Sequence, residues 1–107
     1  MEIHNYCVVV TTAGSLDKAE ELASLVLDSK LGACVQISQI TSFYFWKDKV
    51  NNEGEYRLEI KTRSSLYRKL EDLILKNHSY QTPEIIQIPI VNGSEAYLNW
   101  VEESTLQ

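Results

Sequence analysis

Cysteine is scarce in this sequence. Only two of the 107 residues are cysteines, Cys7 and Cys34, and no Cys-x-x-Cys spacing occurs. Both lie inside apolar, strand-like runs, where a free thiol packs as a small hydrophobic side chain. A metal-chaperone module of this kind of sequence would carry paired cysteines after its first strand. We therefore expect two free thiols rather than a disulfide or a cysteine metal site.

Positive charge is also in short supply. Ten lysines and arginines stand against fifteen aspartates and glutamates, and the formal net charge is −5. Proteins that bind nucleic-acid backbones neutralise phosphates with lysine and arginine, so we expect no nucleic-acid partner. The signature of RNA-binding domains is missing as well, because Glu55-Tyr56-Arg57 occupies the strand that would carry it. An acidic protein can still attract cations.

Long apolar runs are missing too. No stretch reaches the roughly 18 to 20 apolar residues that cross a bilayer, and the first residues lack the layout of a signal peptide. We therefore expect a cytoplasmic protein without a membrane partner. A chain of 107 residues, 44% hydrophobic and 23% charged, is typical of one globular domain spanning residues 1–107.

Motifs for catalysis are absent from the sequence. The turn Ala13-Gly14-Ser15 is too short for a phosphate-binding loop and lacks the lysine that follows such loops. No cysteine–histidine or serine–histidine pair has the spacing of a known local signature. We therefore expect a protein that is not an enzyme.

The residues that are present alternate between strand and helix patterns. Segments rich in apolar and β-branched residues predict strands, namely residues 6–12, 33–46, 55–62 and 84–90. Leucines at three-and-four spacing predict helices after good N-cap serines, namely Ser15 with a stop at Gly32, Ser64 or Ser65 with an end near Asn77, and Ser94. The last helix is expected to bury Tyr97, Leu98 and Val101. The predicted fold is α+β, a ferredoxin-like βαββαβ sandwich with an extra C-terminal helix.

Two strands carry further predictions. In residues 33–46 the apolar positions change parity, which a bulge near Ser38-Gln39 would reconcile. The polar run 47–54 is then expected to form the turn of a hairpin. In residues 84–90, Pro89 cannot donate to a sheet ladder, so this strand lies at an edge or ends at Pro89.

The aromatic run Phe43-Tyr44-Phe45-Trp46 predicts self-association. Two helices cover only one face of a four-stranded sheet, and this run is apolar on both sides. Because an open aromatic edge invites uncontrolled strand pairing, we expect a closed homo-oligomer in which extended strands pair between chains.

Candidate binding residues fall into two groups. His78 lies at the end of a predicted helix, where an imidazole interacts with terminal carbonyls, and this structural role competes with metal ligation. The second group would line an inter-subunit cleft that orients a small ligand, with Trp46 as an apolar wall; its members are Trp46, Glu59, Lys61, Tyr80 and Glu84. The alternative is that the charges of residues 55–61 are solvated or paired with each other, and that Glu84 accepts backbone hydrogen bonds at a strand entry.

Six motifs together resemble the divalent-cation-tolerance (CutA) family across nearly the whole chain. They are Ala33-Cys34-Val35-x-Ile37, Ser42-x-Tyr44-x-Trp46, Glu53-x-Glu55, Lys61-Thr62, His78-x-Tyr80-x-x-Pro83-Glu84 and Tyr97-Leu98-x-Trp100. The resemblance implies a ferredoxin-like fold, a tightly packed homotrimer of intertwined sheets, and a role linked to tolerance of copper or other divalent cations.

The sequence departs from copper-binding members of that family at two places. The copper-binding members that this chain resembles carry a cysteine near the end of the first strand, where this chain has Thr11 and Thr12. They also carry two consecutive histidines, where this chain has Asn77-His78. Thiolate is the ligand that selects soft Cu(I). The resemblance therefore carries over only His78 as a ligand for copper or zinc.

These observations predict a small homotrimer that binds a divalent metal ion or a small molecule at subunit clefts. A second hypothesis is a signalling or scaffold trimer similar to the PII proteins, which binds an anionic metabolite between subunits. A purely structural role is the third.

Overall fold

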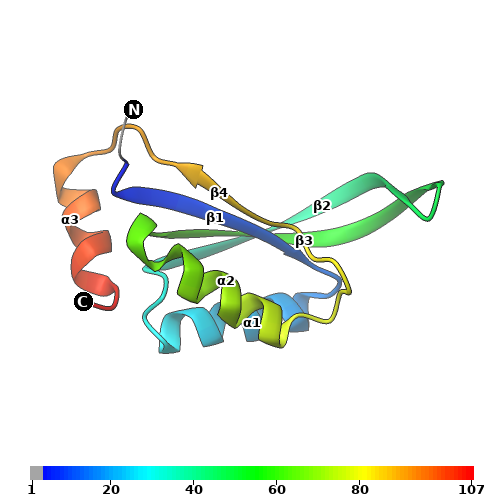
Figure 1. Ribbon diagram of the computed structural model, residues 1–107, viewed down its shortest axis with the longest axis horizontal. Helices are drawn as coiled ribbons and strands as arrows, with labels where there is room; N and C mark the ends of the chain where they lie inside the picture. Colours follow the sequence, from blue (N-terminus) through cyan, green and yellow to red (C-terminus); the bar gives the residue numbers. More distant parts are fainter. Residues whose placement is uncertain (1–3) are drawn as a thin grey trace.

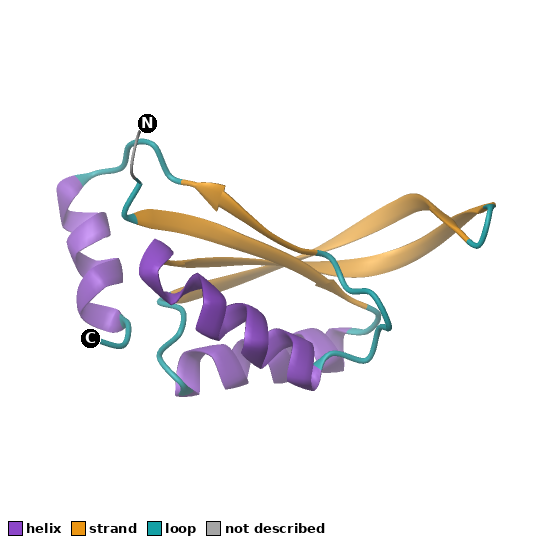
Figure 2. Ribbon diagram, in the orientation of Figure 1, coloured by secondary structure: helices purple, strands orange, loops and turns teal. Residues whose placement is uncertain are grey.

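One antiparallel sheet with the strand order β2-β3-β1-β4 organises the chain. The computed structural model describes residues 4–107. In chain order the elements are β1 (Tyr6–Ala13), α1 (Leu16–Asp28), β2 (Cys34–Trp46), β3 (Lys49–Arg63), a 3-10 turn (Ser64–Leu66), α2 (Tyr67–Asn77), β4 (Ile85–Pro89) and α3 (Glu95–Ser104). Figures 1 and 2 show α1 and α2 on one face of the sheet and α3 at one end. The predicted α+β order, βαββαβ plus a C-terminal helix, is confirmed.

The edge position of β4 follows from its proline. This strand pairs with β1, from Thr11 opposite Ile85 to Cys7 opposite Pro89, and it is the last strand of the sheet. Pro89 is its final residue, as expected for a residue without an N–H donor. Both forms of the prediction for Pro89 are therefore confirmed.

The hairpin of β2 and β3 corrects two predictions. The chain reverses at Lys47 and Asp48 alone, with φ of 53° and 62°, the signs required by a two-residue turn that matches the strand twist. Residues 49–54 are strand, so the predicted eight-residue turn is wrong. Pairing runs unbroken from Cys34 opposite Lys61 to Trp46 opposite Lys49, so the predicted bulge near residues 38–39 is also wrong.

The change of parity in β2 has a different cause. Val35 and Ile37 pack against the core beneath the helices, and the strand then continues beyond the helices into a long twisted arm (Figure 1). No helix within residues 4–107 covers either face of the arm (Figure 1), so its apolar side chains need not keep to one face of the strand. The aromatic residues at its end are therefore uncovered in a single chain, with Phe43 70% and Phe45 77% exposed.

The core lies between the sheet and helices α1 and α2. Val9 and Ile60 from the sheet meet Val26, Leu70 and Ile74 from the helices, and all five are buried. The loop after α1 packs equally closely. At Gly32, a Cβ atom would lie 2.6 Å from Ile60 Cγ2 and 2.7 Å from Val26 Cγ1, so the absence of a side chain there lets the loop approach the core.

Helix ends follow the predicted caps in two of three cases. Ser15 accepts a hydrogen bond from the Lys18 N–H, and Ser94 accepts one from the Tyr97 N–H. Helix α1 ends at Asp28 rather than near Gly32, and α2 is preceded by a 3-10 turn instead of a serine cap. A 3-10 turn satisfies the first backbone groups without a side chain.

Helix α3 packs at one end of the sheet (Figure 1), where it contacts β3 and the start of β1. The Tyr6 hydroxyl donates to Glu102 Oε1 over 3.1 Å, and Arg63 Nε donates to Thr105 Oγ1 over 3.0 Å. Val101 is fully buried, as predicted, whereas Tyr97 is 41% exposed. Because α3 and the hairpin tip lie at opposite ends of the molecule (Figure 1), α3 does not shield the aromatic arm.

Both cysteines are free thiols, with Cys7 buried and Cys34 half-buried. None of the helices within residues 4–107 combines the length and the apolar character needed to span a membrane.

Candidate functional site

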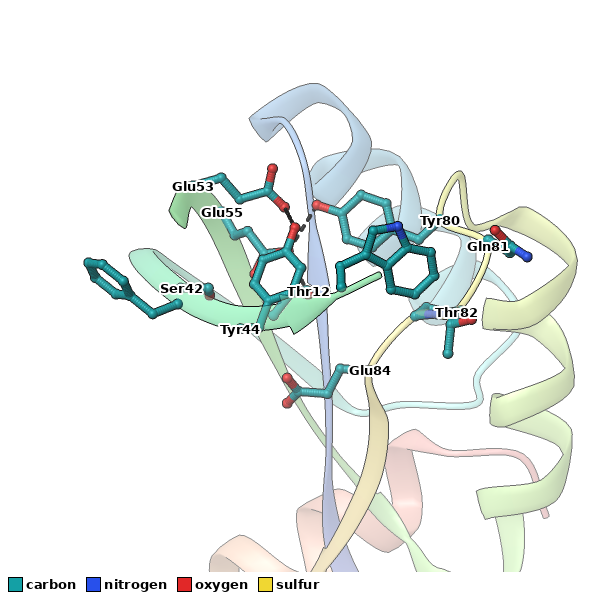
Figure 3. Close-up of a pocket in the computed structure, with 12 residues that line it drawn as sticks. Thr12, Ser42, Tyr44, Glu53, Glu55, Tyr80, Gln81, Thr82 and Glu84 are labelled. Atoms are coloured by element: carbon teal, nitrogen blue, oxygen red, sulfur yellow. Dashed lines mark hydrogen bonds between the residues drawn. The ribbon is translucent and has the colours of Figure 1, made fainter. Parts of the chain in front are cut away.

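A cavity of about 600 Å³ lies where the aromatic arm meets the loop between α2 and β4. Figure 3 shows Tyr44 from β2, Glu53 and Glu55 from β3 and Tyr80 from the loop turned toward one another. Four of the lining side chains are aromatic, namely Phe43, Tyr44, Trp46 and Tyr80. Three are carboxylates, namely Glu53, Glu55 and Glu84. We call this space the acidic aromatic cavity.

Glu55 is the buried carboxylate of the cavity. It is 6% exposed, and its Oε2 atom accepts hydrogen bonds from Thr12 Oγ1 at 3.0 Å and from the Tyr80 hydroxyl at 2.9 Å. In the part of the chain that the structure describes, no donor reaches Oε1 and no lysine or arginine forms an ion pair with this carboxylate. The prediction that Glu55 belongs to a row of solvated or mutually paired charges is therefore wrong, because the loop carrying Tyr80 folds over it.

Tyr80 is held as a hydrogen-bond donor. Burial and then its hydrogen bond to Glu55 raise the pKa of Tyr80 above the ordinary tyrosine value, so the hydroxyl keeps its proton. The ring lies against Gly14, where a Cβ atom would be 3.1 Å from the Tyr80 hydroxyl. The glycine at the end of β1 thus makes room for this hydroxyl to reach Glu55.

His78 uses both of its ring nitrogens within the chain. Nδ1 accepts a hydrogen bond from the Tyr80 N–H at 3.0 Å, so Nδ1 carries no proton. Nε2 then carries the proton of the neutral ring and donates to the Thr12 carbonyl at 2.6 Å. This arrangement ties the end of α2 to the end of β1.

The same arrangement does not support His78 as a metal ligand. A metal needs a free nitrogen lone pair, and His78 has none available while these two bonds persist. Within residues 4–107, no group of three or more histidines, cysteines, aspartates or glutamates is placed to hold a metal ion. The imidazole also contacts a strand carbonyl rather than the helix carbonyls expected from its position at the end of α2.

The structure separates the five predicted cleft residues into two places. Trp46, Tyr80 and Glu84 line the acidic aromatic cavity. Glu59 and Lys61 lie elsewhere on β3: Glu59 pairs in register with Gln36, which is ten residues before Trp46 in β2. At about 3.3 Å per residue, the separation along the strand is roughly 30 Å.

Glu59 and Lys61 also have partners of their own. Glu59 Oε2 lies 3.6 Å from Arg57 Nη2, and Lys61 Nζ donates to Gln36 Oε1. The Arg57–Glu59 contact fits the alternative prediction that the charges on this strand pair with each other, whereas Lys61 contacts a neutral amide on β2.

Sequence reasoning missed Thr12 and the role of Glu53 and Glu55. The strand register places Glu53 opposite Ser42, and the Tyr44 hydroxyl donates to Glu53 Oε1. The Glu53-x-Glu55 spacing was a usable signal, since alternate residues of a strand share a face. It could not reveal that residues 80–84 cover that face.

The electrostatics of the cavity favour positively charged ligands. Its lining within residues 4–107 includes three carboxylates and no lysine, arginine or histidine. Carboxylates in a partly enclosed space attract cations and repel anions.

Comparison with known proteins identifies the family. The family model described as CutA1 divalent ion tolerance protein matches residues 7–104. The chain belongs to the CutA1 family. The match covers nearly the whole chain.

Individual relatives agree with the assignment. The divalent-cation tolerance protein CutA of Archaeoglobus fulgidus is 39% identical over 102 residues, covering 95% of this chain and 98% of the relative. Protein CutA, chloroplastic, of Arabidopsis thaliana is 41% identical over 99 residues, and this CutA1 chain spans 54% of its length. The crystal structure of CutA1 from Shewanella sp. SIB1 matches with a TM-score of 0.95 at 30% identity, covering 99% of this chain and 100% of that one.

Proposed function

We propose that this CutA1 chain acts as a closed homotrimer that serves divalent cation tolerance by binding a metal ion or a small cationic ligand at its subunit clefts, without catalytic turnover. One observation carries the proposal: the acidic aromatic cavity is built on the same hairpin arm whose aromatic side chains are uncovered. Phe43 and Trp46 line the cavity and are 70% and 41% exposed. A neighbouring chain that covers them also encloses the cavity.

The case for self-association rests on exposed apolar area. The arm carries Phe43, Phe45 and Val50, each at least 65% exposed in a single chain. Contiguous apolar patches of this kind mark interaction surfaces. A closed ring of copies removes them without forming an open-ended fibre.

The predicted five-residue cleft requires two chains. Glu59 and Lys61 do not line the cavity of their own chain and lie roughly 30 Å along the strands from Trp46, so a site that joins them to Trp46 needs a neighbouring copy. This sharing is part of the proposal.

The charge of the cavity supports a cation over an anion. The alternative, a PII-like trimer that binds an anionic metabolite, needs basic side chains to hold the anion. Among the described residues that line the cavity, the charged side chains are all acidic. The PII-like hypothesis would depend on Lys61 of a neighbouring copy.

The donors do not fit a soft copper site. Thr11 and Thr12 stand where a thiolate would be needed, and both nitrogens of His78 are engaged. Carboxylate oxygens suit harder ions. Any metal ion at the cleft is therefore expected to be held by oxygen atoms, drawn from more than one chain.

Sedimentation and calorimetry test the proposal. Phe45 is 77% exposed and does not line the cavity, so Phe45→Ser probes assembly while leaving the cavity side chains intact. We expect a trimer for the parent chain, dissociation of Phe45→Ser, and no change for Leu75→Ser, whose side chain is 51% exposed on α2. Titration with copper, zinc and a nucleotide then separates cation from anion binding. A stable parent monomer at micromolar concentration would contradict the proposal.

A further inference from the structure

The Glu55 carboxylate lacks a compensating positive charge. Glu55 is only 6% exposed, and both of its hydroxyl donors contact Oε2. Removing a carboxylate from water costs several kcal/mol unless charge and hydrogen bonds compensate. The second oxygen, Oε1, has no protein donor among the described residues and is not one of their fully buried atoms without a partner, so it still contacts solvent in the cavity that Glu55 lines. A positively charged group entering the cavity would replace that solvent with a counterion.

The walls around Glu55 suit an organic cation. Tyr44, Trp46 and Tyr80 line the same cavity as Glu55. Aromatic faces attract cations through the ring quadrupole, most strongly at tryptophan, and this is how proteins recognise quaternary ammonium groups. The apolar body of such a cation also gains from contact with the rings, whereas a hydrated metal ion does not.

The size and donor set of the cavity point the same way. A volume of about 600 Å³ lies in the range of sites for small molecules. A calcium or magnesium ion needs about six oxygen ligands close together, and residues 4–107 offer no cluster of three ionisable ligands. The two other carboxylates do not join Glu55 around one ion, because Glu84 is exposed and Glu53 accepts a hydrogen bond from Tyr44.

From these contacts we infer that the acidic aromatic cavity binds a small organic cation, an amine or ammonium group with an apolar body, which Glu55 and the aromatic side chains hold together. This inference rests on the proposed cleft function and names the chemical class of its ligand.

Three isosteric probes test the charge. Tetramethylammonium chloride, neutral tert-butanol and anionic pivalate are similar in shape and are titrated into the assembled protein by calorimetry at constant ionic strength. We expect saturable binding of tetramethylammonium alone. Equal binding of tert-butanol would overturn the inference, because it would indicate a purely apolar pocket.

Matched variants test the residues. Glu55→Gln keeps an oxygen acceptor for both hydroxyls but removes the charge, and we expect affinity for tetramethylammonium to fall about tenfold or more. Trp46→Leu keeps an apolar side chain but loses the ring, and we expect a similar loss. Glu20→Gln, on the exposed surface of α1, is the control and should bind as the parent does. Unchanged affinity in Glu55→Gln would overturn the inference.

A last variant separates this inference from the proposed function. If tetramethylammonium binds to Lys61→Met but not to the parent trimer, Lys61 of a neighbouring copy is the counterion of Glu55 and the inference is wrong. If the parent trimer binds copper or zinc but no ammonium probe, the inference also fails while the cleft function stands. If the parent chain is not a trimer in sedimentation, the proposed function itself is wrong.

Discussion

Glu55 and Tyr80 are 25 positions apart in the chain and are joined by a 2.9 Å hydrogen bond from the tyrosine hydroxyl to the carboxylate. Glu55 belongs to the middle of the longest strand, and Tyr80 belongs to the loop after α2. The bond fixes that loop over the base of the hairpin arm. Together with the bond from His78 to the Thr12 carbonyl, it sets the shape of the acidic aromatic cavity.

Tyr80→Phe should destabilise the fold, because Thr12 is then the only residue within 4–107 that donates a hydrogen bond to Glu55. Hydrogen bonds to charged groups contribute about 1.5–3 kcal/mol, and partial exposure of Tyr80 lowers the expected loss to about 1–2 kcal/mol. Urea unfolding at fixed protein concentration measures it. The control is Tyr67→Phe, whose hydroxyl contacts the more exposed Glu71 at 2.8 Å. Equal losses in the two variants would contradict the importance assigned to the buried carboxylate.

Stability should fall at alkaline pH. The pKa of Tyr80 is raised in the folded chain by burial and by Glu55. Such a group contributes stability that is complete below the ordinary tyrosine pKa of about 10 and is lost as the pH rises above it, because the unfolded chain releases its proton first. We expect the free energy of unfolding to decrease as the pH is raised beyond about 10, and to decrease less in Tyr80→Phe. Identical slopes in parent and variant would refute this prediction.

Gly32→Ala should be the more damaging of two matched glycine substitutions. Its new Cβ would lie within 2.7 Å of two core side chains, and overpacking a core costs about 1–3 kcal/mol. In Gly54→Ala, the nearest atom to the new Cβ within residues 4–107 is the Ile40 carbonyl oxygen at 4.0 Å, so stability should be nearly unchanged. Thermal unfolding of both variants under one condition compares them. A tolerated Gly32→Ala would mean that this loop relaxes away from the sheet.

Gly14→Ala should weaken the site without unfolding the protein. Its Cβ would approach the Tyr80 hydroxyl to 3.1 Å, so the ring must shift by a few tenths of an ångström, which disturbs its hydrogen bond to Glu55. We expect the pKa of Tyr80 to move down toward the ordinary value, measured by ultraviolet absorbance during alkaline titration. The midpoint of urea unfolding at neutral pH should change little. An unaltered Tyr80 titration would show that the ring has room to spare.

Much of the fold was predictable because its signals are local. The N-caps at Ser15 and Ser94 depend on hydrogen bonds within a few residues, and the end of β4 depends on the N–H that Pro89 itself lacks. The turn at Lys47 and Asp48 was not predicted, since neither residue is a glycine or asparagine, the usual signals of positive φ. The ends of the hairpin strands were missed for that reason.

The candidate site was predictable only in part. Trp46, Tyr80 and Glu84 were recognised and do meet in one cavity. Glu55 was read as one charge in an alternating strand, because alternation identifies a face without indicating what covers it. Its burial comes from a loop 25 residues away.

The sequence alone determined the order of strands and helices, the edge position of β4, the family resemblance and the apolar character of the arm. These properties follow from side-chain period, backbone chemistry and residue type, which act over a few neighbouring positions. Only the tertiary structure decided that Glu55 is buried, that both nitrogens of His78 are engaged, and that Glu59 and Lys61 lie far from Trp46 in the same chain. These properties depend on strand register and on a loop folding over a distant strand, and no short stretch of sequence specifies such contacts.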